Sequence, residues 1–378
     1  PVAEAGFGRV RFQAEPEGLY RALMALRSAD RVLLEAALFA GEDFDALFEG
    51  TRAVPWERYI PRGFALRVVK VRSNRSRLTA LTSIQAVVHR AAADRLCRVY
   101  KINRLPEGGK TAELRIYIEK NWVSLLLDLS GEPLFKRGYR TEGGIAPLRE
   151  TTAAAILLLS GWRRKFPLRD PFCGSGTIII EAALYAWDMA PGLRRSFALT
   201  DLLLGDAEIE GKVREELWGK VDFSRRVRIL GSDADTRAVS LARSNLSRAY
   251  DLAHRRLPRQ GIGAVGEAAG EPVPASPLPE LRVLPMEQAR ASGEPGFIIT
   301  NPPYGKRLGD PESAEGIYRD MGELARRFPG WKLGVITDHP GFESFLGIKA
   351  DSCREITNGA AAVYFFQYDE LRPKRGSM

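Results

Sequence analysis

The chain of 378 residues contains only three cysteines and three histidines. Cys97, Cys173 and Cys353 lie far apart, and none has the short spacing of a zinc knuckle or a redox pair. We therefore expect neither a structural metal nor a disulfide, and the cysteine usage indicates a reducing compartment. No apolar run approaches the ~20 residues that span a bilayer, and the first residues lack the charged and apolar regions of a secretory signal. These absences favour a cytoplasmic protein.

Positive charge is concentrated in the first part of the chain. The net charge of +9 is modest, but residues 1–150 hold 25 Lys and Arg against 18 Asp and Glu. Residues 62–104 alone contain eleven basic residues and a single acid, Asp94. The positive charges of such a stripe repel one another unless a polyanion neutralises them, which favours contacts with phosphate groups. The alternative is a solvated helix face. Within the stripe we expect four residues to contact RNA: Lys70, Arg72, Arg75 and Arg77.

The first 130 residues mix short strands and helices, which is typical of small α+β modules. Apolar residues recur at helical spacing over residues 19–38, and a second helix is predicted over residues 79–96. Alternating apolar and polar residues predict strands at residues 8–12, 64–73 and, as a pair, 112–130.

From about residue 150 strands alternate with helices, the pattern of a doubly wound, mostly parallel sheet. The predicted order is a strand at 169–172, a helix at 176–190, a strand at 227–233, a helix at 236–250, strands at 281–286 and 297–300, a helix at 317–328, and a strand at 332–338. Asn358-Gly359 between two apolar runs predicts a terminal antiparallel hairpin, which completes a sheet of seven strands. Residues 191–226 are interpreted as an inserted helical excursion, and residues 257–280 as a surface loop.

The first motif, DPFCGSGT at residues 170–177, ends a predicted strand and leads into an apolar helix. Its two glycines allow a tight turn and the close approach of a ligand, at the position where α/β sheets bind nucleotide-like molecules. The motif has no lysine and no GKS/T ending, so it is not a phosphate-binding P-loop. It fits a ligand in which Asp170 accepts a hydrogen bond from an ammonium group. A purely structural turn is the alternative.

The second motif is Asp233 in GSDAD, at the end of the next predicted strand. A carboxylate at this position can accept hydrogen bonds from both hydroxyls of a ribose. It could instead cap the following helix. We expect Asp233 to bind the ligand and Asp235 or Thr236 to cap the helix.

The third motif, TNPPYG at residues 300–305, follows the apolar strand FIIT and is the most specific of the three. An aromatic amine is a poor nucleophile and must be held in line and polarised. The side-chain carbonyl of Asn301 and the main-chain carbonyl of Pro302 can accept its two hydrogens. The two prolines, Pro302 and Pro303, stiffen the turn, and Tyr304 offers a face to a flipped base. A bare turn is the alternative.

With these motifs, the chain resembles class I methyltransferases that depend on S-adenosylmethionine (SAM) and methylate amines. Within them it is similar to the THUMP-containing RNA guanine-N2 methyltransferases, especially the bacterial group that modifies large-subunit rRNA. The resemblance extends over almost the whole chain. Besides the motifs, it rests on RALMALRSADRVLLE, FDALFEG, VRSNRSRLTALTSIQ, LFKRGYRTEGGIAPLRETTAAAILLLSGW and EAALYAWDMAPG.

The resemblance implies a site. It assigns the target base to Asn301, Pro302, Pro303 and Tyr304. Where many SAM enzymes carry an Asp for the adenine, this chain has Pro285-Met286-Glu287, which indicates an apolar or main-chain contact. Arg137 and Arg140 are expected either to contact RNA or to seal the domain junction. The cofactor contacts that the resemblance implies are Asp170, Pro171, Phe172, Cys173, Gly174, Ser175, Gly176, Thr177, Asp233, Ala234, Met286 and Glu287, with Leu148 and Glu150 at the pocket edge.

The resemblance also implies a domain order and a function. A ferredoxin-like module at 1–60, beginning inside the module, is followed by a THUMP RNA-binding domain at 61–130, a linker at 131–149, the methyltransferase domain at 150–372 and a tail at 373–378. We expect methyl transfer to the N2 amine of a guanine in structured RNA, with 23S rRNA favoured over tRNA. The alternatives are an adenine-N6 or DNA amino methyltransferase, and a non-catalytic RNA-binding protein.

Overall fold

The computed structural model describes residues 2–6, 8–140, 148–254, 278–303 and 311–372, without the side chains of 311–313. The predicted tail at 373–378 and most of the predicted loop at 257–280 therefore lie outside the described residues. Among the described residues, no helix combines the length and the apolar character needed to cross a membrane.

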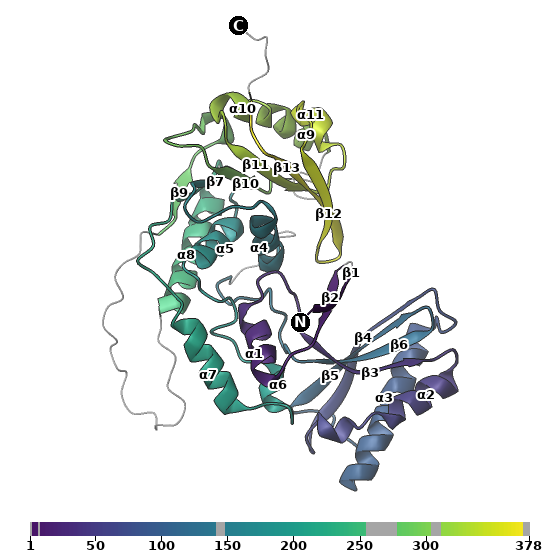
Figure 1. The fold of residues 1–378 in the computed structure, drawn as a ribbon. Coiled ribbons are helices and arrows are strands. Elements are labelled where there is room, and N and C mark those ends of the chain that lie inside the picture. Colours follow the sequence, from purple (N-terminus) through teal and green to yellow (C-terminus); the bar gives the residue numbers. More distant parts are fainter. Residues whose placement is uncertain (1, 7, 141–147, 255–277, 304–310, 373–378) are drawn as a thin grey trace, which may run out of the picture.

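A seven-stranded sheet forms the centre of the larger domain (Figure 1). Five strands run parallel, and the last strand enters antiparallel between its neighbours. The predicted doubly wound, mostly parallel sheet with a terminal hairpin is confirmed. The strands are β7 (Leu168–Asp170), β8 (Ile229–Asp233), β9 (Glu280–Val283), β10 (Phe297–Thr300), β11 (Lys332–Thr337), β12 (Ser352–Asn358) and β13 (Ala361–Tyr368), in the order β12-β13-β11-β10-β7-β8-β9.

Helices cover both faces of this sheet, which explains why its central strands β10 and β11 are buried along almost their whole length. Ile298 of β10 packs into the hydrophobic cluster of the later helices, whereas its neighbour Ile299 packs into the cluster of the earlier ones. This alternation is the period of two expected of a strand. One group of helices is α4 (Glu150–Leu159), α5 (Thr177–Ala186) and α8 (Thr236–His254), and the other is α9 (Pro311–Met321), α10 (Leu324–Arg327) and α11 (Phe342–Leu346).

Two details of the larger domain are informative. The turn predicted at Asn358-Gly359 joins β12 to β13, with Gly359 at φ +71°. The helix predicted over 317–328 is interrupted instead of continuous: one helix ends at Met321 and the next begins at Leu324, and Gly322 between them lies so close to other backbone that an added Cβ would be 2.9 Å from the carbonyl oxygen of Leu346. The helical excursion predicted at 191–226 is present as α6 (Ala198–Asp201) and α7 (Ala207–Trp218).

The N-terminal region contains a two-stranded sheet and a four-stranded sheet of order β3-β6-β5-β4. The helix predicted over 19–38 is wrong in its second half, because residues 33–40 pair with β6 as a strand. This strand, which precedes the predicted boundary at residue 60, belongs to the same sheet as three strands that follow the boundary. The elements are β1 (Val2–Gly6), β2 (Arg9–Phe12), α1 (Pro16–Ala25), β3 (Leu33–Ala40), α2 (Phe44–Ala53), a 3-10 turn (Trp56–Arg58), β4 (Ala65–Asn74), α3 (Leu81–Tyr100), β5 (Thr111–Glu119) and β6 (Trp122–Asp128).

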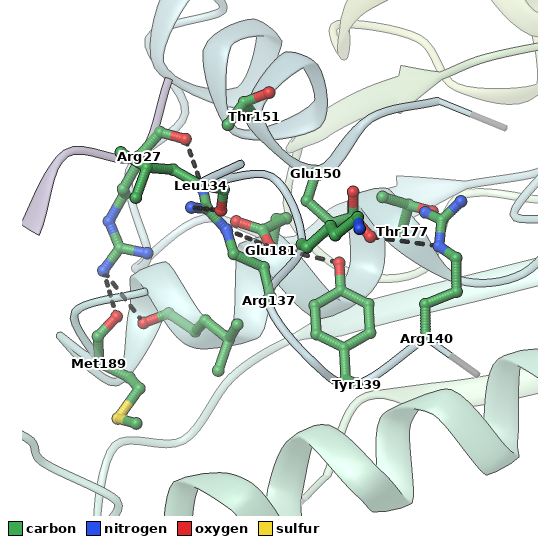
Figure 2. A network of polar contacts seen from close by, with 12 residues as sticks. Arg27, Leu134, Arg137, Tyr139, Arg140, Glu150, Thr151, Thr177, Glu181 and Met189 are labelled. Atoms are coloured by element: carbon green, nitrogen blue, oxygen red, sulfur yellow. Dashed lines mark hydrogen bonds and ion pairs between the residues drawn. The ribbon is translucent and has the colours of Figure 1, made fainter. Parts of the chain in front are cut away.

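Buried polar side chains join the N-terminal region to the larger domain (Figure 2). Arg27, just after α1, donates to the carbonyl oxygen of Met189 at 2.7 Å, and Arg137 donates to the carbonyl oxygen of Arg27 at 2.5 Å. Glu181 on α5 supplies the negative charge: its Oε1 lies 3.6 Å from Arg137 Nε and accepts from the Tyr139 hydroxyl at 3.2 Å. Burial lowers the pKa of Arg27 to about 10. The junction is therefore a set of charges that depend on one carboxylate.

Arg149 ties together three segments that are distant in sequence. Its guanidinium lies 2.7 Å from the Asp30 carboxylate, and its main-chain N–H donates to Asn358 Oδ1 at 3.0 Å. The guanidinium also packs against Gly359, where an added Cβ would be 2.8 Å from Nη2. Thr151 at the start of α4 donates to the same Asp30 carboxylate at 2.5 Å. The N-terminal region, α4 and the hairpin tip are thus held at one point.

Glu181→Gln should destabilise the protein strongly. It leaves the buried Arg137 without its counter-charge and removes one of the two acidic neighbours of Arg27. Removal of one partner of a buried ion pair costs about 3–5 kcal/mol. The free energy of unfolding, measured by urea denaturation, is expected to fall by that amount.

Glu17→Gln is the matched control for this variant. Glu17 of α1 pairs with Lys212 of α7 at 2.9 Å, so this ion pair also joins the two regions, but it is exposed. Its loss should change the free energy of unfolding very little, because solvent screens an exposed ion pair. If both variants lose the same small amount of unfolding free energy, the proposed contribution of the buried network to stability is contradicted.

Candidate active site

The three sequence motifs meet at the carboxyl edge of the sheet. β7 pairs in parallel with β10 on one side and with β8 on the other, so the ends of these three strands are adjacent. The chain leaves β7 and β10 in opposite directions across the sheet, which is the switch point where α/β sheets bind ligands. The loop at 170–177, Asp233 and the turn that begins at Asn301 are therefore neighbours.

The Asp170 carboxylate connects the first and third motifs directly. It is buried, and its Oδ1 accepts hydrogen bonds from the Thr300 hydroxyl at 2.6 Å and from the main-chain N–H of Phe172 at 3.1 Å. Burial raises the pKa of Asp170 to about 7, against the two hydrogen bonds that lower it, and the nearby Asp233 adds to the increase. The folded protein therefore holds a carboxylate that lacks a counter-charge among the described residues.

The glycines of the loop serve two different purposes. Gly176 has φ +83° and lies against α8, where an added Cβ would be 3.1 Å from Ala242 Cβ, so the close packing of loop and helix requires glycine. Gly174 has φ +51°, but its Cβ position has no neighbour within 4 Å. Its N–H donates to Asp233 Oδ2 at 3.0 Å. Open space at Gly174 is what a loop needs if its backbone is to approach a ligand.

The back of the loop is anchored by residues that sequence reasoning missed. Asn245 of α8 is fully buried and donates from Nδ2 to the carbonyl oxygen of Ser175 at 3.0 Å. Arg248 in turn donates to Asn245 Oδ1 at 2.7 Å and to the carbonyl oxygen of Tyr139 at 2.9 Å. The available signal was an asparagine on the alanine- and leucine-rich face of the predicted helix.

Cys173 packs within the loop. Its side chain is buried, and its main-chain N–H donates to the carbonyl oxygen of Ser232 at 2.9 Å. Burial raises the pKa of the thiol. The sulfur is therefore held in the unreactive thiol form. Pro171 is also buried, whereas Phe172 and Ser175 are half-buried.

Asp233 binds the loop and Asp235 caps the helix, which confirms the predicted capping role of Asp235. Asp235 Oδ1 accepts from the main-chain N–H of Arg237 at 2.8 Å at the start of α8. Asp233 Oδ1 accepts from the N–H of Asp235 at 3.0 Å, and its side chain remains half-exposed. Ala234 between them is exposed. Asp233 can therefore still accept hydrogen bonds from a ligand.

The segment after β9 lies beside this edge, because Val283 is paired with Asp233. Met286 is buried in the second hydrophobic cluster, and its carbonyl oxygen accepts from Arg327 at 2.7 Å. Glu287 is exposed. The carbonyl of Met286 already has a partner, so its predicted contact with adenine stays a prediction.

The Asn-Pro-Pro turn presents an unsatisfied acceptor. Asn301 is 7% exposed, and its buried Oδ1 has no hydrogen-bond partner among the described residues. A buried amide oxygen without a donor costs free energy, so its presence calls for an explanation. Pro302 is buried and Pro303 half-buried. Tyr304 lies outside the described residues, and its predicted stacking role stays a prediction.

Leu148 and Glu150 lie close to the start of α5. The loop at 170–177 leads directly into this helix, so both residues lie beside the loop. Arg140 connects them, because its Nη2 donates to Thr177 Oγ1 at 2.8 Å and to the carbonyl oxygen of Leu148 at 3.1 Å. Its Nε is 3.2 Å from Glu150 Oε1. Burial raises the pKa of Glu150, although the Arg140 charge opposes the increase.

The predicted RNA contacts at the junction need correction. Arg137 is buried and holds main-chain carbonyls and Glu181, so the prediction that it contacts RNA is wrong and the alternative, a junction seal, is right. Arg140 is 13% exposed, and it likewise holds a main-chain carbonyl and a carboxylate at the junction. The four residues of the basic stripe differ: Arg72, Arg75 and Arg77 are exposed, and Lys70 is half-buried.

Among the described residues, no group of three or more His, Cys, Asp or Glu side chains is placed to hold a metal ion.

Family models match two parts of the chain. Residues 137–254 and 280–364 match the model described as "RMKL-like, methyltransferase domain", and residues 2–33 match the "RlmL ferredoxin-like domain". The chain is 33% identical over 371 residues to "Putative RNA methyltransferase YpsC" of Bacillus subtilis, which covers 97% of this chain and 90% of that protein. It is 36% identical to "Ribosomal RNA large subunit methyltransferase K/L" of Syntrophotalea carbinolica, over 95% of this chain and 48% of that protein. The chain thus spans about half the length of its K/L relatives.

Solved structures with the same fold are similar over nearly the whole chain. "SMU.472, a putative methyltransferase complexed with SAH" is 33% identical with a TM-score of 0.79, over 95% of this chain and 89% of that one. "A possible methylase from Clostridium difficile 630" is 34% identical with a TM-score of 0.86, over 100% of this chain and 93% of that one. "A predicted N6-adenine-specific DNA methylase from Listeria monocytogenes" is 34% identical with a TM-score of 0.81, over 95% and 87%.

Asp170→Asn should stabilise the ligand-free protein above neutral pH. Because burial raises the Asp170 pKa to about 7, its contribution to stability is complete below the unfolded pKa near 4 and is lost as the pH rises to about 7. Asn keeps an acceptor for Thr300 and Phe172 and removes the buried charge. At pH 8 the gain in unfolding free energy should be about 2–4 kcal/mol, vanishing towards pH 4.

Thermal and urea denaturation at pH 5 and pH 8 measure this difference. Asp235→Asn, at an exposed carboxylate, is the control and should leave the pH dependence of the parent protein unchanged. A variant at position 170 that is less stable than the parent at pH 8 would refute the assigned electrostatic cost.

Proposed function

The chain belongs to the RMKL-like methyltransferase family, and we propose that it transfers a methyl group from SAM to the exocyclic N2 amine of a guanine in structured RNA. The observation that carries the proposal is the buried Oδ1 of Asn301, which has no partner among the described residues and follows Thr300, the residue bonded to Asp170 of the loop. An acceptor that no described residue occupies is what an incoming amine requires.

SAM is the cofactor of this fold family, and the described residues fit it. The Asp170 carboxylate lacks a counter-charge, which suits the ammonium of the methionine part. The free space at Gly174 allows main-chain contact, and the half-exposed Asp233 can accept from the ribose hydroxyls. Leu148, Glu150 and the remaining loop residues border this space in the proposal, with Met286 and Glu287 towards the adenine.

SAM supplies an electrophilic methyl group when it is bound, so the chain has only to position and polarise the amine. The amide oxygen of Asn301 and the carbonyl of Pro302 would each accept one amine hydrogen, which draws the nitrogen lone pair out of the ring system. Because Pro302 and Pro303 restrict the turn, the two acceptors are fixed before the base arrives. Catalysis then comes from orientation and electrostatics.

RNA is the proposed substrate because the basic N-terminal region lies in the same chain as this site. We assign residues 61–130 to a THUMP domain, residues 1–60 to a ferredoxin-like module and 150–372 to the methyltransferase domain, joined by 131–149. Large-subunit rRNA is favoured over tRNA, since the relatives with half-length coverage carry that name.

Asn301→Ala should abolish transfer while SAM binding survives. Loss of one polarising group typically lowers kcat about 100- to 1,000-fold, and Asn301 is not among the residues assigned to SAM. Calorimetry measures SAM binding, and transfer of a labelled methyl group to total RNA measures turnover. Asn103→Ala, at an exposed position outside the site, is the control. Turnover near the parent rate would remove Asn301 from catalysis.

The modified base identifies the substrate. Nucleosides from 23S rRNA of cells lacking the protein should lose N2-methylguanosine at one position, and mass spectrometry of digested rRNA measures it. Restoration by the parent chain but not by Asn301→Ala completes the test. Loss of N6-methyladenine from RNA or DNA would favour the amino methyltransferase named among the solved relatives, and loss from tRNA alone would overturn the ribosomal assignment.

A further inference from the structure

The four-stranded sheet of the N-terminal region has one covered and one open face. Along β5 the buried residues alternate with half-buried ones, and helices α2 and α3 pack on the buried side (Figure 1). On the opposite side, strand pairing aligns Arg72 of β4, Tyr117 of β5, Ser124 of β6 and Leu38 of β3 in one row. Trp122 lies two residues before Ser124 and thus on the same face.

Large apolar side chains remain exposed on this open face. Trp122 is 54% exposed and Leu38 is 46% exposed, while Tyr117 is half-buried. Adjacent exposed aromatic and aliphatic groups mark an interaction site more often than a bare surface. Trp122 stands opposite Ala40, whose small side chain leaves its ring free on that flank.

A cation lies over one of the two aromatic rings, whereas Trp122 is paired across the strands with Glu119. The Arg72 guanidinium lies 5.9 Å from the centre of the Tyr117 ring. Burial lowers the pKa of Lys70, and the charges of Arg72, Arg115, Arg149 and Arg31 lower it further. The positive charges around Lys70 therefore disfavour the protonated form of Lys70 itself.

Two of these cations are available to a ligand. Arg31 and Arg115 both pair with Asp128, and Arg149 pairs with Asp30. Among the described residues, Lys70 and Arg72 form no ion pair. Arg77, by contrast, is held by Glu42 at 2.8 Å. The open face thus combines flat aromatic rings with two cations that lack counter-charges.

We propose that this open face binds an unpaired stretch of the RNA substrate, with bases stacked on Trp122 and Tyr117 and phosphates at Lys70 and Arg72. The inference rests on the proposed function, which makes RNA the substrate. Stacking requires exposed base faces, which a duplex keeps inside its helix. Aromatic platforms flanked by cations are how proteins bind single strands without reading their sequence.

The test compares two RNA probes by fluorescence anisotropy: a ten-nucleotide single strand of uridines and adenosines, and a blunt hairpin of equal charge. Trp122→Ala and Tyr117→Ala should each weaken binding of the single strand roughly 5- to 100-fold and affect the hairpin much less. Trp122→Phe should restore most of the affinity, because it keeps a ring. Phe44→Ala, at an exposed ring of α2 outside this open face, is the matched control and should bind as the parent does.

Salt dependence tests the cations separately. Replacing Lys70 and Arg72 together with Gln should reduce the slope of log affinity against log salt by about 1.4, the value for two phosphate contacts on a single strand. An unchanged slope would overturn their role. Equal losses for single strand and hairpin in the aromatic variants would overturn the stacking proposal.

Methyl transfer separates the failure of this proposal from the failure of the proposed function. Trp122→Ala should raise KM for RNA, keep kcat and leave SAM binding unchanged. If it transfers methyl groups with the parent KM, the docking surface lies elsewhere and the methyltransferase function stands. If the parent chain binds SAM but methylates no RNA, the proposed function itself fails.

Discussion

The hydrogen bond from the Thr300 hydroxyl to the Asp170 carboxylate is the constraint on which the site depends. It joins the ends of two adjacent central strands, so the cofactor loop and the Asn-Pro-Pro turn cannot move apart independently. The bond exists at an electrostatic cost, because the carboxylate is buried and its pKa is raised. A carboxylate kept in such a state is expected where a cationic ligand will compensate it, and functional sites commonly concentrate perturbed groups of this kind.

Sequence reasoning predicted the parts of the molecule that depend on local pattern. The order of strands and helices after residue 150, the Asn358-Gly359 turn and the cap at Asp235 all follow from periodicity and turn chemistry within a few residues. Each of these features is determined by residues that lie close to it in the sequence.

What could not be predicted depends on partners distant in sequence. Residues 33–40 have the composition of a helix but form a strand because β6, more than eighty residues later, offers an edge. Arg137 reads as a surface cation, yet it is buried because Glu181 supplies its counter-charge from α5. Asn245 anchors the cofactor loop across 70 residues. None of these pairings leaves a periodic signal.

The clamp at Arg149 has a consequence for how a target is chosen. Because one residue, through its guanidinium and its main-chain N–H, fixes Asp30, the start of α4 and the hairpin tip together, the spacing between the N-terminal sheet and the edge of the larger sheet is set by the fold. Under the proposed function, a nucleotide would then be selected by its distance from the docked strand. The local sequence around that nucleotide need not be read. Lengthening or shortening the RNA between the two points should shift which base is reached.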